Sequence, residues 1–331
     1  MVSPNTTLNV GSLPVMMTSF NRPETFARVL EVVSKVGCQN VYFASDGPRN
    51  REDLEKIQEC LAMFTTKFPN VSSEKILIRK TNIGCRRAMY ENVKWFFAKV
   101  DMGVVLEDDC LPNEDFFSFM ISSLEAFKSD RKVFMVSGFN PSPFKSDFCY
   151  RKSIYPLVWG WGSWSDRVNN YIVDFNDYKE VVSAGSQLSL RNRWPWYAKL
   201  KWNLIMKHAG NAKLDTWDYS LTAAAWRQFQ YTIVPKTTFI ENIGFGPKAT
   251  HTRKKIPSWA MQKPSTPFEP WKICGNISYG QEESLMDQNL EIPVFGLSTF
   301  GLIKHILGLW KRSLKIGVSS KILKIRKVKR K

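Results

Sequence analysis

Residues 103–109 read Gly-Val-Val-Leu-Glu-Asp-Asp, an apolar run that ends abruptly in three carboxylates. A short apolar run bounded by turn residues is typical of a strand that is buried on both faces. We therefore predict a strand over Gly103–Leu106, with Glu107, Asp108 and Asp109 at its carboxyl end. Ligands of open α/β sheets bind beyond the carboxyl ends of the strands, so this acidic end is the first candidate site.

The segments on either side alternate between strand-like and helix-like patterns. Besides residues 103–106, strands are predicted at Leu13–Thr18, Val41–Ala44, Ile76–Ile78 and Val133–Val136. Apolar residues recur at helical spacing between them, as in the segment that opens with Pro23, an early helix position that proline favours. This regular order predicts an α/β fold, a mostly parallel sheet with helices on both faces.

The pattern changes after about residue 140. Residues 159–164 form a Gly/Trp cluster, whose tryptophans suit either stacking on a sugar ring or packing in the core. Residues 191–207 are rich in tryptophan and basic residues. Beyond them we predict a helix from about Thr216 to Gln228 and a strand at Tyr231–Val234.

Composition excludes several protein classes. With 331 residues, 44% of them hydrophobic and 23% charged, the chain is an ordinary globular mixture, which excludes extended disorder, collagen and coiled coil. The six cysteines are too far apart for a zinc or redox motif and suit a reduced compartment. Residues 1–12 lack the pattern of a signal peptide. We therefore expect a cytoplasmic protein.

The net charge of +17 is concentrated at the C-terminus, since residues 311–331 contain ten basic residues and no acid. The preceding stretch, Ile292–Trp310, is apolar but is interrupted by Pro293 and Lys304, which disfavours a membrane span. As a helix from Ser298 it would have one apolar face, the pattern of a helix lying in a membrane interface. The basic end would add attraction to anionic lipid.

The acidic end at residues 107–109 suits Mg²⁺ or Mn²⁺, which commonly bridge such carboxylates to substrate phosphates. The alternative is an acidic cap on the following helix. A second acidic turn at a strand end, with Asp46, favours the metal, although Asp46 also suits a plain turn. Residues 82–87 suit an anion at a helix start or a simple helix cap.

Two later segments also allow two interpretations each. Asp215 and Asp218 lie where a helix begins, and an acid there is either an N-cap or a general base for a substrate hydroxyl. His251 follows a glycine-rich loop and is either a ligand or phosphate contact or an ordinary loop histidine.

Together these segments resemble the GT-A glycosyltransferase fold. The resemblance rests on residues 14–23, on the Ser45-Asp46-Gly47 turn and on residues 104–109. Residues 110–117 are similar to the stretch after the metal motif in N-acetylglucosaminyltransferase I-type enzymes. Residues 159–164, 217–219 and 242–252 are similar to bacterial glycosyltransferases of surface-polysaccharide pathways, and the resemblance covers about residues 13–252.

The resemblance implies a role for each matching residue. Those implied to bind the donor are Asp46 at the base, Asn21 and Arg22 beside it, Asn82 and Arg86 near the nucleotide and diphosphate, and Glu107 and Asp108 at the sugar and ribose. Asp109 would be the principal ligand of Mn²⁺ or Mg²⁺, with His251 as a second ligand. Asp218 would be the catalytic base, with Asp215 as the second candidate.

The implied protein is a metal-dependent hexosyl- or N-acetylhexosaminyltransferase. It would transfer a sugar from a nucleotide-diphosphate donor, UDP favoured, to a glycan or glycolipid hydroxyl with inversion, in bacterial lipopolysaccharide or surface-polysaccharide synthesis. Residues 1–12 would be an extension, 13–140 the nucleotide-sugar-binding half, 141–291 the acceptor-binding and catalytic half, and 292–331 an amphipathic helix with a polybasic tail. That tail would dock the protein on the inner face of the bacterial inner membrane.

Two other functions compete with this one. The basic tail suits nucleic acid, but it alternates with isoleucine, leucine and valine, and the strand-end acids would repel phosphate without a metal. A sugar nucleotidyltransferase would share the fold. It would usually carry a glycine-rich N-terminal loop followed by Arg and Lys, which residues 18–28 lack.

Overall fold

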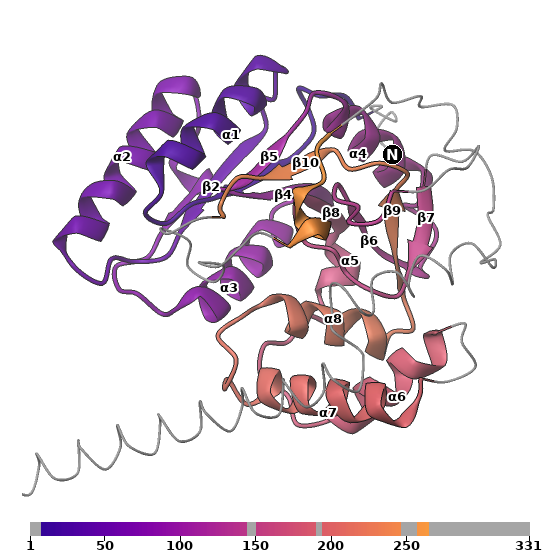
Figure 1. The fold of residues 1–331 in the computed structure, drawn as a ribbon. Helices are drawn as coiled ribbons and strands as arrows, with labels where there is room; N and C mark the ends of the chain where they lie inside the picture. The colour runs from indigo at the N-terminus through magenta and orange to yellow at the C-terminus, as the bar shows by residue number, and fades with distance from the viewer. Residues whose placement is uncertain (1–7, 144–149, 190–193, 246–256, 265–331) are drawn as a thin grey trace, which may run out of the picture.

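A computed structural model of the chain describes residues 8–143, 150–189, 194–245 and 257–264. Figure 1 shows a central sheet with helices around it. The strands are β1 (Val15–Thr18), β2 (Val41–Ser45), β3 (Ile76–Ile78), β4 (Met102–Glu107), β5 (Cys110–Pro112), β6 (Val133–Ser137), β7 (Tyr150–Ser153), β8 (Trp161–Trp164), β9 (Tyr231–Pro235) and β10 (Ile240–Asn242). The helices are α1 (Pro23–Lys35), α2 (Arg51–Lys67), α3 (Cys85–Phe97), α4 (Asp115–Ala126), α5 (Ser165–Val168), α6 (Tyr178–Leu188), α7 (Trp196–Gly210) and α8 (Asp218–Arg227), with 3-10 turns η1 (Ser73–Lys75) and η2 (Ser258–Met261).

Within the described residues, eight strands form one sheet in the order β3-β2-β1-β4-β8-β6-β9-β7. The first four are parallel to one another. Their register aligns Thr18 of β1 with Ala44 of β2 and with Glu107 of β4. The carboxyl ends of β1, β2 and β4 therefore meet at one edge, and the loops that follow them share that edge.

The other half of the sheet is mixed. β8 runs antiparallel to both β4 and β6, β9 is parallel to β6, and β7 is antiparallel to β9. β8 lies within the Gly/Trp cluster at residues 159–164, where no strand was predicted from the sequence. A Cβ on Gly162 would lie 3.2 Å from the Gly103 carbonyl oxygen of the neighbouring β4. Close backbone approach at this glycine is one reason that a glycine-containing segment can form a central strand.

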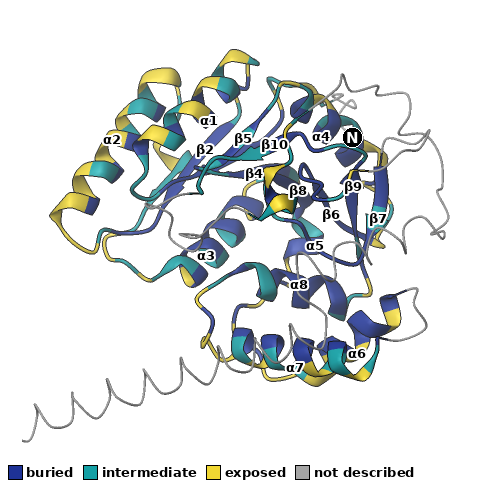
Figure 2. Cartoon of the chain, viewed as in Figure 1, coloured by how far each residue is buried: buried dark blue, intermediate teal, exposed yellow. Residues whose placement is uncertain are grey.

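The strands of the sheet are mostly buried (Figure 2), and their alternate side chains pack against helices on opposite faces. Val15 and Met17 belong to a core with α1, α2 and α4, whereas Met16 belongs to a core with α3 and α8. This period of two is the expected geometry of a buried strand. The predicted α/β class, with a mostly parallel sheet and helices on both faces, is confirmed.

A third core joins α6, α7 and α8 into a helical lobe. Its centre is a group of tryptophans: the rings of Trp202 and Trp226 meet edge to face at 4.8 Å, and Trp194 lies 5.2 Å from Trp226. The Trp226 indole N–H donates to the carbonyl oxygen of Ile154 at 2.7 Å, which links the lobe to the chain beyond β7. Trp194 and Trp202 of the tryptophan-rich segment therefore belong to the core.

The described cysteines Cys38, Cys60, Cys85 and Cys110 are all free thiols, and three of them are buried. Burial raises the pKa of the Cys38 thiol to about 12, so it behaves as a small apolar side chain. In the described part of the chain no helix has both the length and the apolar character that crossing a bilayer requires. The predicted C-terminal helix and basic tail lie outside the described residues.

Candidate active site

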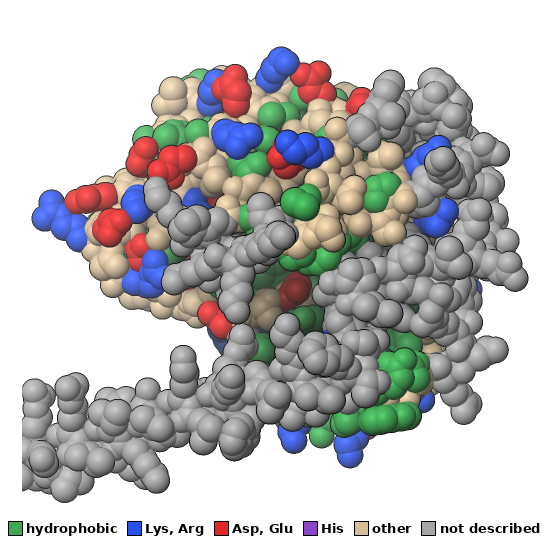
Figure 3. Space-filling view, viewed as in Figure 1, with side chains coloured by type: hydrophobic (Ala, Val, Ile, Leu, Met, Phe, Trp, Pro, Cys, Tyr) green, Lys and Arg blue, Asp and Glu red, His purple; other side chains and the backbone are tan. Residues whose placement is uncertain are grey.

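A cavity of about 670 Å³ opens at the carboxyl ends of β1, β2 and β4. Figure 3 shows an acidic side chain inside a hollow near the centre of the face that is drawn there. The described acids that line it are Asp46, Glu107, Asp108, Asp109, Asp215 and Asp218, and the described arginines that line it are Arg22 and Arg49. Acids outnumber arginines, so the walls carry an excess of negative charge that favours a bound cation.

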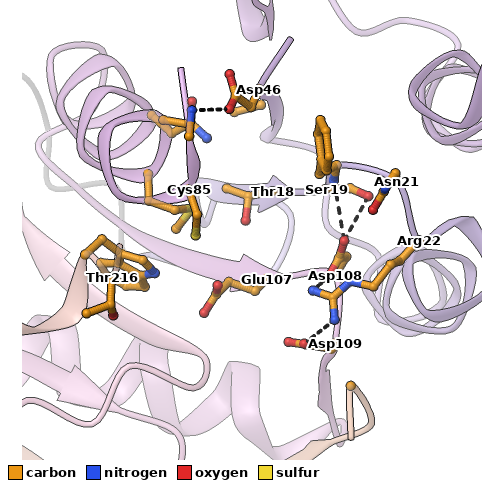
Figure 4. A pocket seen from close by; sticks show the side chains of 18 of the residues that line it. Thr18, Ser19, Asn21, Arg22, Asp46, Cys85, Glu107, Asp108, Asp109 and Thr216 are labelled. Carbon is orange, nitrogen blue, oxygen red and sulfur yellow. Dashed lines mark hydrogen bonds and ion pairs between the residues drawn. The ribbon is translucent and has the colours of Figure 1, made fainter. Parts of the chain in front are cut away.

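The acidic triplet follows β4, and Arg22 holds two of its members (Figure 4). The guanidinium forms ion pairs with Asp108 and with Asp109, the latter at 2.7 Å. Asp108 is buried and also accepts hydrogen bonds from the Ser19 hydroxyl at 3.3 Å and the Phe20 backbone N–H at 3.4 Å. The loop after β1 thus fixes the loop after β4.

The crowding of carboxylates changes their protonation. Burial, followed by the charges of Asp109 and Asp108, raises the pKa of Glu107 well above its usual range. Burial also raises the pKa of Asp108 to about 7, although Arg22 opposes this. Burial disfavours the charge on Arg22, but Asp108 and Asp109 outweigh it and raise the pKa of the guanidinium. A divalent cation would relieve the same repulsion.

Asp109 lies against a glycine that leaves room for its carboxylate. A Cβ on Gly244 would lie 2.1 Å from Asp109 Oδ2. The contact arises because β10 pairs antiparallel with β5, and the Ile243 N–H donates to the Asp109 carbonyl oxygen at 2.8 Å. A segment more than 130 positions away in the sequence therefore forms the wall next to the acidic triplet.

We tested whether these residues fit Mn²⁺ or Mg²⁺. No group of three His, Cys, Asp or Glu side chains within the described ranges is arranged to hold a metal ion. Such ions are, however, often held by one or two carboxylates together with substrate phosphates. The side chain of Asp109, 16% exposed at the cavity, the room beside Gly244 and the negative excess fit that kind of site.

Asp46 joins two loops at the cavity wall. Its carboxylate accepts hydrogen bonds from the backbone N–H groups of Gly47, Ile83 and Gly84 at 2.7–3.0 Å. Asn82 donates to the Gly47 carbonyl oxygen at 2.9 Å. Asp46 and Asn82 both line the cavity, at the end of β2 and at the start of α3.

Asn21 belongs to a second polar group at the rim. Its amide donates to Asp53 Oδ1 at 2.7 Å, and Arg49 binds Asp53 through two hydrogen bonds of 2.6 and 2.9 Å. The hydrogen bond from Arg49 holds the pKa of Asp53 down at about 2. The Arg49 guanidinium also lies 4.9 Å from the ring centre of Phe20.

Arg49, Asp53 and Phe20 were not predicted from the sequence as site residues. One local signal was present, because Asn50 caps α2 by accepting from the Asp53 N–H at 2.9 Å. An Asn three residues before an Asp at a helix start predicts that arrangement. The stacking of Arg49 on Phe20 has no such signal.

The two candidate bases lie just before α8 and at its first residue, and both line the cavity. Asp218 is the first residue of α8, and its carboxylate accepts a hydrogen bond from the Thr216 hydroxyl. Asp215 instead accepts from the Arg86 backbone N–H at 3.3 Å. That N–H belongs to the first turn of α3, so Asp215 caps a different helix from the one that it precedes.

The Arg86 side chain points away from the cavity. It is buried, donates to Asp174 Oδ1 at 2.9 Å and to the Ala209 carbonyl oxygen at 2.7 Å, and also contacts the Val173 carbonyl oxygen. It is not among the residues that line the cavity. The structure places the guanidinium between α3 and the helical lobe rather than in the cavity, where a diphosphate contact was predicted.

The tryptophans of the Gly/Trp cluster were predicted either to pack in the core or to stack on a sugar ring, and they do not all lie in the same environment. Trp161 and Trp164 are buried in the core. Trp159 lines the cavity, with the ring of Trp259 stacked 5.5 Å from it and Phe245 5.8 Å away. His251, the predicted second metal ligand, lies outside the described residues.

Comparisons with known proteins add little to this geometry. No protein-family model and no curated protein sequence matches the chain. Among solved structures, the chain is similar to the mannosyltransferase PcManGT from Pyrobaculum calidifontis in complex with GDP-Man and Mn²⁺, with a TM-score of 0.36 and 10% identity. The match covers 65% of this chain and 69% of that one. A similarity this weak carries no argument, so function is inferred from the cavity.

Proposed function

We propose that the protein is a metal-dependent glycosyltransferase that uses a nucleotide-diphosphate sugar, with UDP as the favoured nucleotide. The observation that carries this proposal is the acidic end of β4 inside a cavity at the carboxyl ends of parallel strands. Such an edge is where α/β sheets bind ligands. The resemblance of residues 14–23, 45–47 and 104–109 to the GT-A fold supports the same function.

In this proposal Asp109 holds Mn²⁺ or Mg²⁺ together with the donor phosphates, and His251 is a further candidate ligand. The metal, when bound, would neutralise the charge that builds on the departing nucleoside diphosphate. Glu107 and Asp108 contact the donor sugar and ribose. Arg22 keeps the Asp108 and Asp109 carboxylates in place before the donor binds, as its two ion pairs indicate.

The nucleotide lies along the other part of the same wall. Asp46, Asn21 and Asn82 are assigned to the nucleotide because all three line the cavity beyond β1 and β2. Since the guanidinium of Arg86 is engaged with Asp174 and with backbone carbonyls, we assign it to positioning α3 rather than to binding the diphosphate.

Asp218 is the proposed catalytic base. It lines the same cavity as the acidic triplet, and its charge contributes to the raised pKa of Glu107, so an acceptor hydroxyl could lie between it and the donor. It would take the proton of that hydroxyl as the oxygen attacks the anomeric carbon, in a transfer with inversion. Asp215 is the second candidate, and its carboxylate accepts a hydrogen bond from the first turn of α3.

We further propose that residues 13–140 bind the nucleotide sugar and that residues 141–291 bind the acceptor, a glycan or glycolipid of bacterial lipopolysaccharide or surface-polysaccharide synthesis. Residues 292–331 would dock the protein on the inner face of the bacterial inner membrane. The basis is the apolar face and the ten basic residues of that segment.

Turnover of donors tests the proposal. Full-length protein is incubated with Mn²⁺ and a panel of UDP-, GDP-, CMP- and ADP-linked sugars, and released nucleotide is measured with and without EDTA. Metal-dependent release from one nucleotide class supports the proposal, and Glu55→Gln, on the exposed side of α2, serves as the charge-removal control. Release that EDTA leaves intact, or that Asp109→Asn leaves intact, contradicts the metal site.

A further inference from the structure

Helix α7 has an outer face that is unlike the surface of an ordinary globular protein. Trp196 is 69% exposed, the most exposed large hydrophobic side chain in the described part of the chain, and Leu200 is 41% exposed. Residues four apart share one face of a helix, and Leu204, which is partly exposed, extends the row. The opposite face, with Trp202, packs into the lobe core. The helix is therefore apolar on both sides.

The charges on α7 have one sign. Its residues include Lys199, Lys201 and Lys207 and no acid. Lys199 lies beside the apolar row, three residues after Trp196, and Lys207 lies at its far end, three residues after Leu204. At the lower edge of Figure 3, below the position of α7 in Figure 1, hydrophobic side chains lie beside lysine or arginine side chains.

We propose that the outer face of α7 is a membrane-contact surface for anionic lipid, separate from the C-terminal tail. An exposed tryptophan with leucine between lysines matches the boundary between head groups and acyl chains, where aromatic rings lie and lysine stems extend to the phosphates. A second copy of the chain fits less well. A two-fold interface uses the same patch twice, so it would bring the lysines of one copy against those of the other.

The position of α7 in the chain indicates what the membrane contact would do. Five residues after α7 ends at Gly210, the chain reaches Asp215 in the cavity wall. Docking through α7 would therefore hold the segment that carries Asp215 close to the lipid surface. Only this last consequence rests on the proposed glycosyltransferase activity, since it would suit an acceptor carried on a lipid.

Cosedimentation of the full-length protein with vesicles tests the proposal. On mixed phosphatidylcholine–phosphatidylglycerol vesicles, Trp196→Ala/Leu200→Ala is expected to bind about tenfold more weakly than wild type. Lys199→Gln/Lys207→Gln is expected to weaken binding about twentyfold on these vesicles and hardly at all on pure phosphatidylcholine. Leu54→Ala, which removes an equally exposed leucine from α2, is the control and should bind like wild type.

A direct readout excludes an indirect effect on folding. Brominated phosphatidylcholine in the mixed vesicles should quench part of the tryptophan fluorescence, and Trp196→Phe should remove that part. Binding of both double variants at wild-type strength would overturn the proposal and leave the tail as the whole anchor. Loss of self-association in sedimentation velocity, with vesicle binding unchanged, would overturn it in favour of a second copy. Nucleotide binding by each variant is measured alongside, so that failure here and failure of the proposed function are separate results.

Discussion

The parallel half of the sheet and the rest of the fold contribute to the cavity in different ways. From the parallel half, the cavity receives residues that lie within a few positions of a strand end, such as Asp46 and Asp109. The rest of the fold supplies residues delivered by long connections. Gly244 arrives through the pairing of β10 with β5, and Asp218 arrives through the segment that joins α7 to α8. The first wall depends on local sequence and the second on tertiary packing.

This difference separates two properties of the site. The parallel wall concentrates the negative charge and its partner Arg22, which suits binding of a metal and a nucleotide. The second wall, formed by residues from outside the parallel half, carries Asp218, which suits proton transfer. If the comparison is right, substitutions in the two walls should affect binding and chemistry separately.

Asp218→Asn is expected to have the largest effect. Removing a general base should slow transfer about 10²–10⁴-fold while nucleotide affinity stays the same. Asp215→Asn is the matched variant, and it should mainly weaken the cap of α3, with a loss of about 1 kcal/mol in unfolding free energy. Single-turnover rates and denaturation curves measure both. If Asp215→Asn slows transfer more than Asp218→Asn, the two roles are exchanged.

Trp226→Ala tests how far the catalytic wall depends on the lobe. Deleting this buried ring should lower the unfolding free energy by about 3–5 kcal/mol, because it leaves a cavity and removes the partner of the Ile154 carbonyl. Trp196→Ala makes the same chemical change at an exposed position of the same lobe, so its effect should stay within about 0.5 kcal/mol. Urea denaturation compares the two, and equal losses would contradict the assignment of the core.

Gly244→Ala probes the contact between the two walls. The new methyl group would collide with the Asp109 carboxylate, so we expect a loss of about 10–100-fold in metal-dependent nucleotide affinity. Gly37→Ala is the control: Gly37 has a φ of +85° and no atom near the added methyl. It should cost about 1 kcal/mol of stability and leave affinity unchanged. An unchanged affinity in Gly244→Ala would contradict the site geometry.

Asp53 provides the smallest and most specific test. Its pKa is about 2 in the folded protein, below the usual value, so its ion pair stabilises the fold above about pH 4. That contribution should fall as the pH drops from about 4 to 2. Because Arg49 is largely exposed, we expect Asp53→Asn to lose only about 1–2 kcal/mol at pH 6. Urea denaturation at pH 6 and pH 3 measures it. If Asp53→Asn loses the same unfolding free energy relative to wild type at pH 6 and at pH 3, the assigned pKa is contradicted.

The sequence alone was sufficient to predict the parallel half. Each of its strands is an apolar run followed by a turn signal, and the observed β1, β2 and β4 differ from the predicted ranges by at most two residues at an end. Parallel register then places Glu107 beside the end of β1. The gathering of acids and polar residues there follows from that topology.

In the mixed half, β6 and β9 match the strands predicted at Val133–Val136 and Tyr231–Val234, whereas β7 and β8 were not predicted. β8 lacks a strand pattern because Gly162 and the tryptophans suit a loop as well as a strand. Its place beside β4 involves Gly162, where an added Cβ would lie 3.2 Å from the Gly103 carbonyl oxygen. The direction of the Arg86 side chain also could not be predicted from the sequence. It depends on carbonyl oxygens of Val173 and Ala209, which come from distant segments.

Calorimetry of nucleoside diphosphate binding tests the central claim most directly. UDP, GDP, ADP and CMP are titrated into wild type and Asp109→Asn, each with and without Mn²⁺. We predict that wild type binds one nucleoside diphosphate at least about 100-fold more tightly with Mn²⁺ than without, and that Asp109→Asn abolishes this metal effect. Absence of nucleotide binding with Mn²⁺ present, or an unchanged metal effect in Asp109→Asn, would contradict the account.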